Sequence, residues 1–315
     1  MSRKIALIAI GGNALLQEKT RGLQEEQLEN ARQTAEMFAK VVQSGMSLCI
    51  VHGNGPQVGN LLIQMEAAAN RLPQYTLDIC DAMTQGSMGY MIERALINRL
   101  AYLGVDVPVT TVLTEVVVDK DDPGFQNPTK PVGPFYNRFR SEELQKQKGW
   151  SMREDAGRGW RKVVPSPKPL EIIQLESIKL LLEAGHCVVA GGGGGIPVIR
   201  DASGLLVGVE AVIDKDRLSS LLADQLGADT YVILTGVPKV ALDFNRPTQR
   251  WVSRLTATEA ARHLAEGQFP AGSMGPKIES ALAFLKAGGH EVLITSAEAL
   301  ENEPYETVGT RIVAD

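Results

Sequence analysis

Hydrophobic runs alternate with amphipathic stretches along this chain, and glycine marks most of the boundaries between them. The runs are rich in β-branched residues, so we predict strands over residues 5–10, 46–51, 188–190, 231–234 and 292–295. Apolar positions recur every three or four residues between the runs, which predicts helices over residues 24–44, 87–103, 170–184, 216–226 and 281–287. Thr256 and Glu259 form a capping-box pattern that opens a further helix ending near Gly267.

This alternation of strands and helices indicates an α/β fold, a three-layer αβα sandwich with a mostly parallel central sheet. Residues 119–169 break the rhythm, because they are rich in proline, aromatic residues and charges and lack a long helical stripe. A linker would lack the aromatic residues, so we predict a subdomain that protrudes from the sheet and returns to it. Both a lid over a binding site and a decorative insertion fit this stretch.

Three of the strands end in glycine-rich turns, at Gly11, at Gly53 to Gly55 and at residues 191–195. Such turns expose backbone N–H groups that suit phosphate or carboxylate, and the carboxyl ends of parallel strands share one edge of a sheet. A single turn is equally compatible with a tight connection, but three at one edge favour an anionic ligand. Asn13 and Asn54 act there either as turn formers or as side-chain amides for a small polar substrate.

Two lysines stand where helices are predicted to begin, Lys215 and Lys277. The helix dipole disfavours a cation at this position, so each lysine needs a nearby anion. Asp214 and Asp216 flank Lys215 and are explained either as helix N-terminal charges or, for Asp216, as a group that holds the lysines in place.

Composition excludes several classes of function. The formal net charge is −5, which provides no basic footprint for nucleic acid or an anionic membrane surface. No run of ~18 apolar residues is present, and the first apolar run is shorter than the ~7–15 residues of a signal peptide. The three cysteines lack metal or redox spacing, as do the four histidines for zinc, so we expect buried, reduced thiols in a cytoplasmic protein.

Known nucleotide-binding motifs fit poorly. No P-loop pattern is present. Gly53, Gly55 and Gly59 approach a dinucleotide fingerprint, but no strand ending in an acidic residue follows at the required distance, which disfavours a nicotinamide cofactor.

Together the glycine and lysine motifs resemble those of the carbamate kinase family, within the amino acid kinase superfamily. The resemblance runs from residue 5 to about residue 313, and the segment 127–133 within the insertion makes it specific. Only the segment 234–239 departs from the family pattern; in the family this segment is associated with adenine binding. The motifs are Ile10-Gly11-Gly12-Asn13-Ala14-Leu15, Val51-His52-Gly53-Asn54-Gly55-Pro56-Gln57-Val58-Gly59, Asn127-Pro128-Thr129-Lys130-Pro131-Val132-Gly133, residues 191–197, Val212-Ile213-Asp214-Lys215-Asp216 and Gly272-Ser273-Met274-Gly275-Pro276-Lys277.

The resemblance implies a homodimeric phosphotransferase that interconverts ATP plus carbamate with ADP plus carbamoyl phosphate, using Mg²⁺. It implies one amino acid kinase domain over residues 1–315, with an acceptor-binding N-lobe over about 1–210 and a nucleotide-binding C-lobe over about 211–315. Catabolism of arginine and of purine breakdown products are both compatible with this reaction. One alternative is a superfamily enzyme with a different carboxylate or phosphate acceptor. The other is a non-catalytic, ligand-sensing relative, which the presence of Lys215, Asp216 and Lys277 disfavours.

The expected site residues fall into three groups, and the metal ligands stay open. Lys130, delivered by the lid as a phosphate contact, enters through the resemblance alone. We expect catalytic roles for Lys130, Lys215, Asp216 and Lys277, contacts to the phosphoryl or carbamoyl group from Gly11, Gly12, Asn13, Gly53, Asn54, Gly55, Gly193 and Gly194, and nucleotide contacts from Asp214, Thr235, Val237, Met274 and Gly275.

Overall fold

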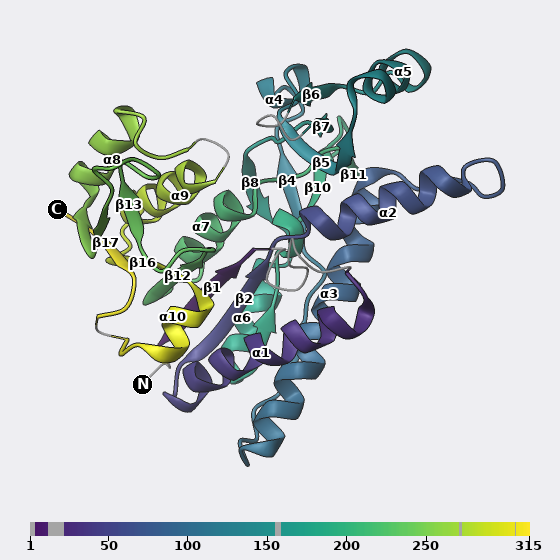
Figure 1. Ribbon diagram of the computed structural model, residues 1–315. Helices are drawn as coiled ribbons and strands as arrows, with labels where there is room; N and C mark the ends of the chain where they lie inside the picture. Colours follow the sequence, from purple (N-terminus) through teal and green to yellow (C-terminus); the bar gives the residue numbers. More distant parts are fainter. Residues whose placement is uncertain (1–3, 12–21, 155–158, 271–272, 306) are drawn as a thin grey trace.

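A mostly parallel eight-stranded sheet forms the centre of the molecule (Figure 1). The computed structural model describes residues 4–11, 22–154, 159–270, 273–305 and 307–315. Neighbouring strands of this sheet are parallel except β16 and β17. In spatial order the strands are β15 (Arg254–Thr256), β17 (Thr310–Val313), β16 (Glu291–Thr295), β12 (Thr230–Leu234), β1 (Ile5–Ile10), β2 (Ser47–His52), β9 (Cys187–Val189) and β3 (Val109–Thr111).

Helices cover both faces of this sheet, as the sequence predicts. Side chains alternate along each strand, so Leu7 and Ala9 of β1 join one apolar cluster, while Ala6, Ile8 and Ile10 join another. One face carries α6 (Leu175–Glu183), α7 (Lys215–Gln225), α8 (Ala257–Ala265) and α9 (Met274–Lys286), and the other carries α1 (Gln24–Gln43), α3 (Leu77–Tyr102) and α10 (Ala297–Asn302). The three-layer αβα architecture is therefore confirmed.

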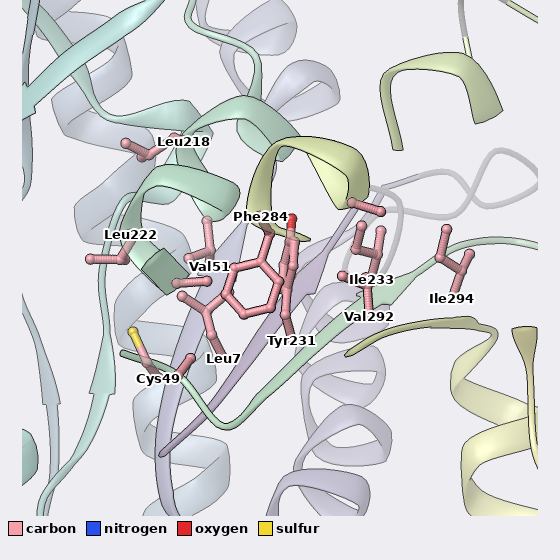
Figure 2. Close-up of a cluster of buried hydrophobic side chains, with 14 of the residues drawn as sticks. Leu7, Cys49, Val51, Leu218, Leu222, Tyr231, Ile233, Phe284, Val292 and Ile294 are labelled. Carbon is pink, nitrogen blue, oxygen red and sulfur yellow. The ribbon is translucent and has the colours of Figure 1, made fainter. Parts of the chain in front are cut away.

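Large buried side chains fix α7 and α9 side by side on the sheet (Figure 2). Tyr231 of β12 meets Phe284 of α9 edge to face, with ring centroids 5.4 Å apart. Leu218 and Leu222 of α7 pack into the same cluster, against residues of β1 and β2 that include Val51. Both helices therefore begin at the same edge of the sheet, where the central parallel strands end.

The remaining strands form smaller sheets beside the central one. A four-stranded sheet carries the chain from the core to the protruding subdomain and back, and β13 pairs with β14 in a two-stranded ribbon. The four-stranded order is β11 (Leu206–Gly208), β10 (Ile196–Arg200), β4 (Glu115–Val118) and β8 (Pro169–Ile172), and the ribbon joins β13 (Val240–Leu242) to β14 (Arg250–Val252).

The protruding subdomain stands at the top of the molecule in Figure 1. Its three-stranded sheet leans on α2 (Gly55–Ala68), where Gly59 approaches Gly133 so closely that a Cβ on Gly59 would lie 2.8 Å from the Gly133 Cα. The subdomain consists of α4 (Pro123–Gln126), β5 (Lys130–Tyr136), α5 (Arg138–Lys148), β6 (Met152–Glu154) and β7 (Trp160–Val164).

Three helix boundaries expected from the sequence were wrong, and one helix was not predicted. Helix α3 begins at Leu77 rather than at residue 87, because its first turns bury polar side chains that interrupt the apolar stripe. Helix α6 begins at Leu175 because residues 169–172 form β8, and α9 begins at Met274, ahead of the apolar stretch. The insertion does contain a sizeable helix, α5, which buries only Ser141 and Leu144 and is defined by its caps, Asn137 and left-handed Gly149.

Candidate active site

Gly11, the turn at Gly53 to Gly55 and the turn at residues 191–195 follow the carboxyl ends of the adjacent strands β1, β2 and β9. A Cβ on Gly193, whose φ is +70°, would lie 2.3 Å from the Asn54 Nδ2, and one on Gly194 would lie 2.2 Å from the Ile213 carbonyl oxygen. Only glycine permits these approaches. The third turn is thereby pressed against both Asn54 and the segment that leads into Lys215.

Not every expected backbone donor is free for a ligand. The Gly53 N–H donates to the Ile10 carbonyl at 2.9 Å, and the Gly194 N–H donates to the Gly191 carbonyl at 3.1 Å. The expected role of the Gly53 amide as a ligand donor is not supported by this geometry. Gly55 opens α2, where an N–H has no partner within the helix. Gly11 directly follows β1, and Gly12 and Asn13 lie outside the described residues.

A buried aspartate brings the two key lysines together, although they lie far apart in sequence. The Lys277 Nζ donates to Asp216 Oδ2 at 2.9 Å, and the Lys215 Nζ lies 2.9 Å from Asp216 Oδ1. Ser280 of α9 donates to the Asp216 carbonyl oxygen and meets the Tyr231 hydroxyl at 2.8 Å, which ties both helices to the core. The sequence-based expectation that Asp216 holds the lysines in place agrees with this geometry.

The electrostatics of this ion triad favour an anionic ligand. Burial would raise the pKa of Asp216, but the two lysines overcome this effect and hold the pKa of this carboxyl well below its usual value. Burial lowers the pKa of Lys215, Asp216 opposes this effect, and the Lys277 ammonium adds to it. The contact between Lys215 Nζ and Asp216 Oδ1 falls outside hydrogen-bonding geometry, and both atoms are buried. The lysine therefore keeps hydrogen-bonding capacity for a ligand.

Lys130 reaches the same edge of the sheet from the subdomain. Its Nζ donates to Asp214 Oδ2 at 2.6 Å. Asp214 also caps α7, because its Oδ1 accepts from the N–H of Asp216 at 2.9 Å and of Arg217 at 3.4 Å. Burial would raise the pKa of Asp214, yet Lys130 and Lys215 hold it below its usual value. Asp214, expected to bind nucleotide, here links the subdomain lysine to the helix that carries Lys215.

Sequence reasoning missed a group of buried polar residues at the start of α3. Gln85 donates to the Gly192 carbonyl at 2.8 Å and accepts from the Thr114 N–H at 2.8 Å, so it supports the third glycine turn. Asp81 and Thr84 hold the Asn54 side chain. The signal was available, because polar residues at spacings of three and four lie on one helical face. These polar residues lie before residue 87, where the helix was predicted to begin, so the pattern was not recognised.

His52 is a buried neutral group in the site. Burial lowers its pKa to about 4, a hydrogen bond with the Gly53 carbonyl opposes this, and nearby Lys215 lowers it further. A Cβ on Gly192 would lie 2.4 Å from its Nε2, so the ring packs directly on the third glycine turn. At neutral pH His52 therefore adds no charge to the site.

The residues expected to bind nucleotide lie at two places. Thr235 and Val237 are half-buried just after β12, and the Thr235 N–H donates to the Thr295 carbonyl at 2.8 Å. Met274 packs on the core at the start of α9, where the Gly275 N–H donates to the Pro270 carbonyl at 2.9 Å. Their contact with nucleotide stays a prediction.

The carboxylates of the site are poorly suited to hold a metal by themselves. Asp214 and Asp216 already pair with lysines. Across the part of the chain that the structure describes, no group of three or more His, Cys, Asp or Glu side chains is arranged to hold a metal ion. Within the same residues, no helix is both long and apolar enough to span a membrane.

Comparison with known proteins identifies the family. Residues 4–296 match the amino acid kinase family. A carbamate kinase of Thermococcus kodakarensis is 47% identical over 319 residues, covering 99% of this chain and 100% of the relative, and one of Clostridium perfringens is 44% identical over 315 residues, covering 98% and 99%. The solved structure of a carbamate kinase from Giardia lamblia bound to AMP-PNP superposes with a TM-score of 0.92 at 40% identity, covering 99% of both chains. The chain therefore belongs to the amino acid kinase family and, within it, to the carbamate kinases.

Proposed function

We propose that this enzyme catalyses reversible phosphoryl transfer between ATP and carbamate, giving ADP and carbamoyl phosphate. The observation that carries the proposal is the pairing of Lys215 and Lys277 with one buried aspartate at the start of α7, where the third glycine turn packs against the segment that leads into Lys215. Full-length relatives named as carbamate kinases support the same reaction.

The reaction asks for alignment and positive charge rather than for a general base. Carbamate is already an anion, so its oxygen attacks the γ-phosphorus while the bond to the bridging oxygen breaks and its electrons remain on ADP. Lys215 and Lys277 stabilise the charge on the transferring phosphoryl group, which is the main demand of such a transition state. Asp216 orients the lysines and takes no proton, in keeping with its lowered pKa.

The two lobes have separate roles in this proposal. The N-lobe, about residues 1–210, binds carbamate or carbamoyl phosphate, and Lys130 of the subdomain over residues 119–169 contributes a phosphate contact. The C-lobe, about residues 211–315, binds ATP or ADP through Thr235, Val237, Met274 and Gly275. That the Giardia lamblia relative was solved bound to AMP-PNP supports a nucleotide site on this fold.

Mg²⁺ enters this proposal as part of the nucleotide substrate. Oxygen-rich phosphates are the usual partners of Mg²⁺ in kinase sites, and the site carboxylates are occupied by lysines. We therefore assign no protein ligand to the metal and no reaction step to it.

The enzyme is further proposed to act as a cytoplasmic homodimer. Ile79, Met83, Tyr90 and Ile97 are all exposed on α3, and their spacing places them on a single face of the helix. Exposed apolar side chains on one helical face suit an isologous contact, in which the same face of a second copy covers them.

A coupled assay for ATP formation from ADP and carbamoyl phosphate tests the function. We expect ATP to form, with little phosphorylation of N-acetylglutamate or UMP when ATP is offered with these acceptors. ATP formation that fails with carbamoyl phosphate, or activity that appears only with one of the other acceptors, would overturn the assignment to carbamate.

A further inference from the structure

The side chain of Asn54 is held by two residues of α3 that no reaction step uses. Asn54 stands just before α2, and its side chain is almost fully buried. Its Nδ2 donates one hydrogen bond to Asp81 Oδ1 and one to Thr84 Oγ1, both at 2.9 Å. These two bonds use both N–H groups of the amide.

The hydroxyl of Thr84 determines which way the Asn54 amide faces. Thr84 Oγ1 donates its single proton to the Asp81 carbonyl oxygen at 2.7 Å. The hydroxyl oxygen can then only accept, so the amide nitrogen of Asn54, and not its oxygen, must face it. The amide packs against the third glycine turn, where a Cβ on Gly193 would lie 2.3 Å from Nδ2 and 3.0 Å from Oδ1, so this turn also borders the remaining polar atom, Oδ1.

Hydrogen-bond donors dominate the groups placed to meet an anionic ligand. Lys215 and Lys277 offer only donors, the Gly55 N–H at the start of α2 is a further donor, and the carboxylates of Asp214 and Asp216 are already paired with lysines. Donors suit the oxygens of phosphate and carboxylate but leave the amino group of carbamate unsatisfied. That amino group is conjugated with the carboxyl carbon, so it donates hydrogen bonds and accepts poorly.

We propose that Asn54 Oδ1 accepts a hydrogen bond from the amino group of carbamate or carbamoyl phosphate, and that Asp81 and Thr84 are positioning residues that fix this acceptor. The inference rests on the proposed function and names the contact that selects the substrate. Acetyl phosphate has a methyl group where carbamoyl phosphate has the amino group, so it cannot make this bond. A buried acceptor left unpaired by the analogue discriminates against it.

The chemical state of Asp81 fits this positioning role. Burial raises the pKa of this carboxyl well above its usual value, Asn54 opposes the shift, and Asp78 adds to it. The Asp81 Oδ1 accepts from the Asn54 amide whether or not Oδ2 carries a proton. Its Oδ2 is buried and has no hydrogen-bond partner among the described residues. An asparagine would therefore reproduce its function, whereas a leucine of similar size would remove it.

The test compares kcat/KM for carbamoyl phosphate with kcat/KM for acetyl phosphate, both with ADP. We expect this ratio to fall by about tenfold in Thr84→Val and in Asp81→Leu, because the amide is then free to rotate. The matched variants Thr84→Ser and Asp81→Asn keep the acceptors and should keep the ratio. Where turnover of acetyl phosphate is too slow, its Ki as a competitive inhibitor against carbamoyl phosphate replaces kcat/KM.

Direct removal of the acceptor gives a second, independent variant. Asn54→Ala should lower kcat/KM for carbamoyl phosphate by at least about tenfold more than for acetyl phosphate. Equal losses for both substrates in Asn54→Ala and in the α3 variants would overturn the inference while leaving the enzyme a carbamate kinase. Failure of the wild-type protein to use carbamoyl phosphate would instead overturn the proposed function.

Discussion

The carboxylate of Asp216 is the residue around which the charges of the site are arranged. It pairs with both Lys215 and Lys277, so each lysine has a structural partner as well as a proposed role on the phosphoryl group. From the sequence alone, truncation of either lysine is expected to leave thermal stability nearly unchanged. The triad changes this expectation, because each truncation also removes one partner of a buried charge.

We expect Lys215→Ala and Lys277→Ala each to lower kcat by about two decades, the scale of losing one preorganised donor. Each variant should also lose some stability, but less than the ~3–5 kcal/mol of an unpaired buried charge, since the other lysine remains. Steady-state kinetics and thermal unfolding measure the two effects, and Lys179→Ala on the surface of α6 is the control. Near wild-type turnover in both variants would refute the assignment of these lysines.

A second prediction at the scale of residues concerns how Asp81 makes the free energy of unfolding depend on pH. Its pKa is raised in the folded protein, so between its ordinary value of 3.8 and its folded value the native state binds more protons than the unfolded chain. Stability must therefore fall as pH rises through this window, by up to about 1.4 kcal/mol per pH unit. Asp81→Asn removes this contribution. The difference in unfolding free energy between wild type and variant, measured by urea titration, should decline with rising pH from about pH 4. A difference that is independent of pH contradicts a raised pKa of Asp81 in the folded protein.

At the scale of elements, the position of Lys130 depends on how β5 packs on α2. Lys130 is the first residue of β5, and Gly133 of the same strand lies against Gly59 of α2. A methyl group at residue 59 would meet backbone atoms of Gly133 at 2.8 and 2.9 Å, so the strand must move to accommodate it.

We expect Gly59→Ala to raise the KM for carbamoyl phosphate by about tenfold or more, as Lys130→Ala should, while the KM for ADP changes little. If the effect passes through Lys130, the double variant should behave like Lys130→Ala alone. Losses that simply add in the double variant would show that Gly59 acts elsewhere. An unchanged KM and kcat in Lys130→Ala would remove this lysine from the site.

The elements also show what the sequence could predict. The central strands are apolar runs, so local patterns predict the fold, and Lys215 and Lys277 stand out because each lies at or near the start of a predicted helix. The polar start of α3 was not predicted from the sequence. Asp81 and Thr84 are buried because they hydrogen-bond to Asn54, and a search for apolar periodicity does not detect buried polar residues. Two hydrogen bonds were also not predicted, that of the Gly53 N–H to the Ile10 carbonyl and that of Lys130 to Asp214. Both depend on packing between segments that are distant in sequence.

At the scale of the whole molecule, the apolar stripe on α3 is the surface that we propose a second copy of the chain covers. Helix α3 packs against α1 on one side, and the stripe faces away from that contact toward solvent. Ile79, Met83 and Ile97 are 43, 40 and 43% exposed, and Tyr90 is 58% exposed. Four large apolar side chains on one exposed helical face are costly to leave in water.

Light scattering coupled to gel filtration tests whether a second copy covers this stripe. The wild-type protein should elute at twice the chain mass of 34.0 kDa, and Tyr90→Asp or Ile97→Asp should elute at the chain mass, because a two-fold contact buries each introduced charge twice. Leu180→Asp is the matched control, since Leu180 is 65% exposed on α6, which covers the opposite face of the sheet. A monomeric wild type, or α3 variants that remain dimeric, would show that the stripe is not the dimer interface. Because the triad and the glycine turns lie within one chain, the monomeric variants should keep measurable ATP formation, which separates assembly from catalysis.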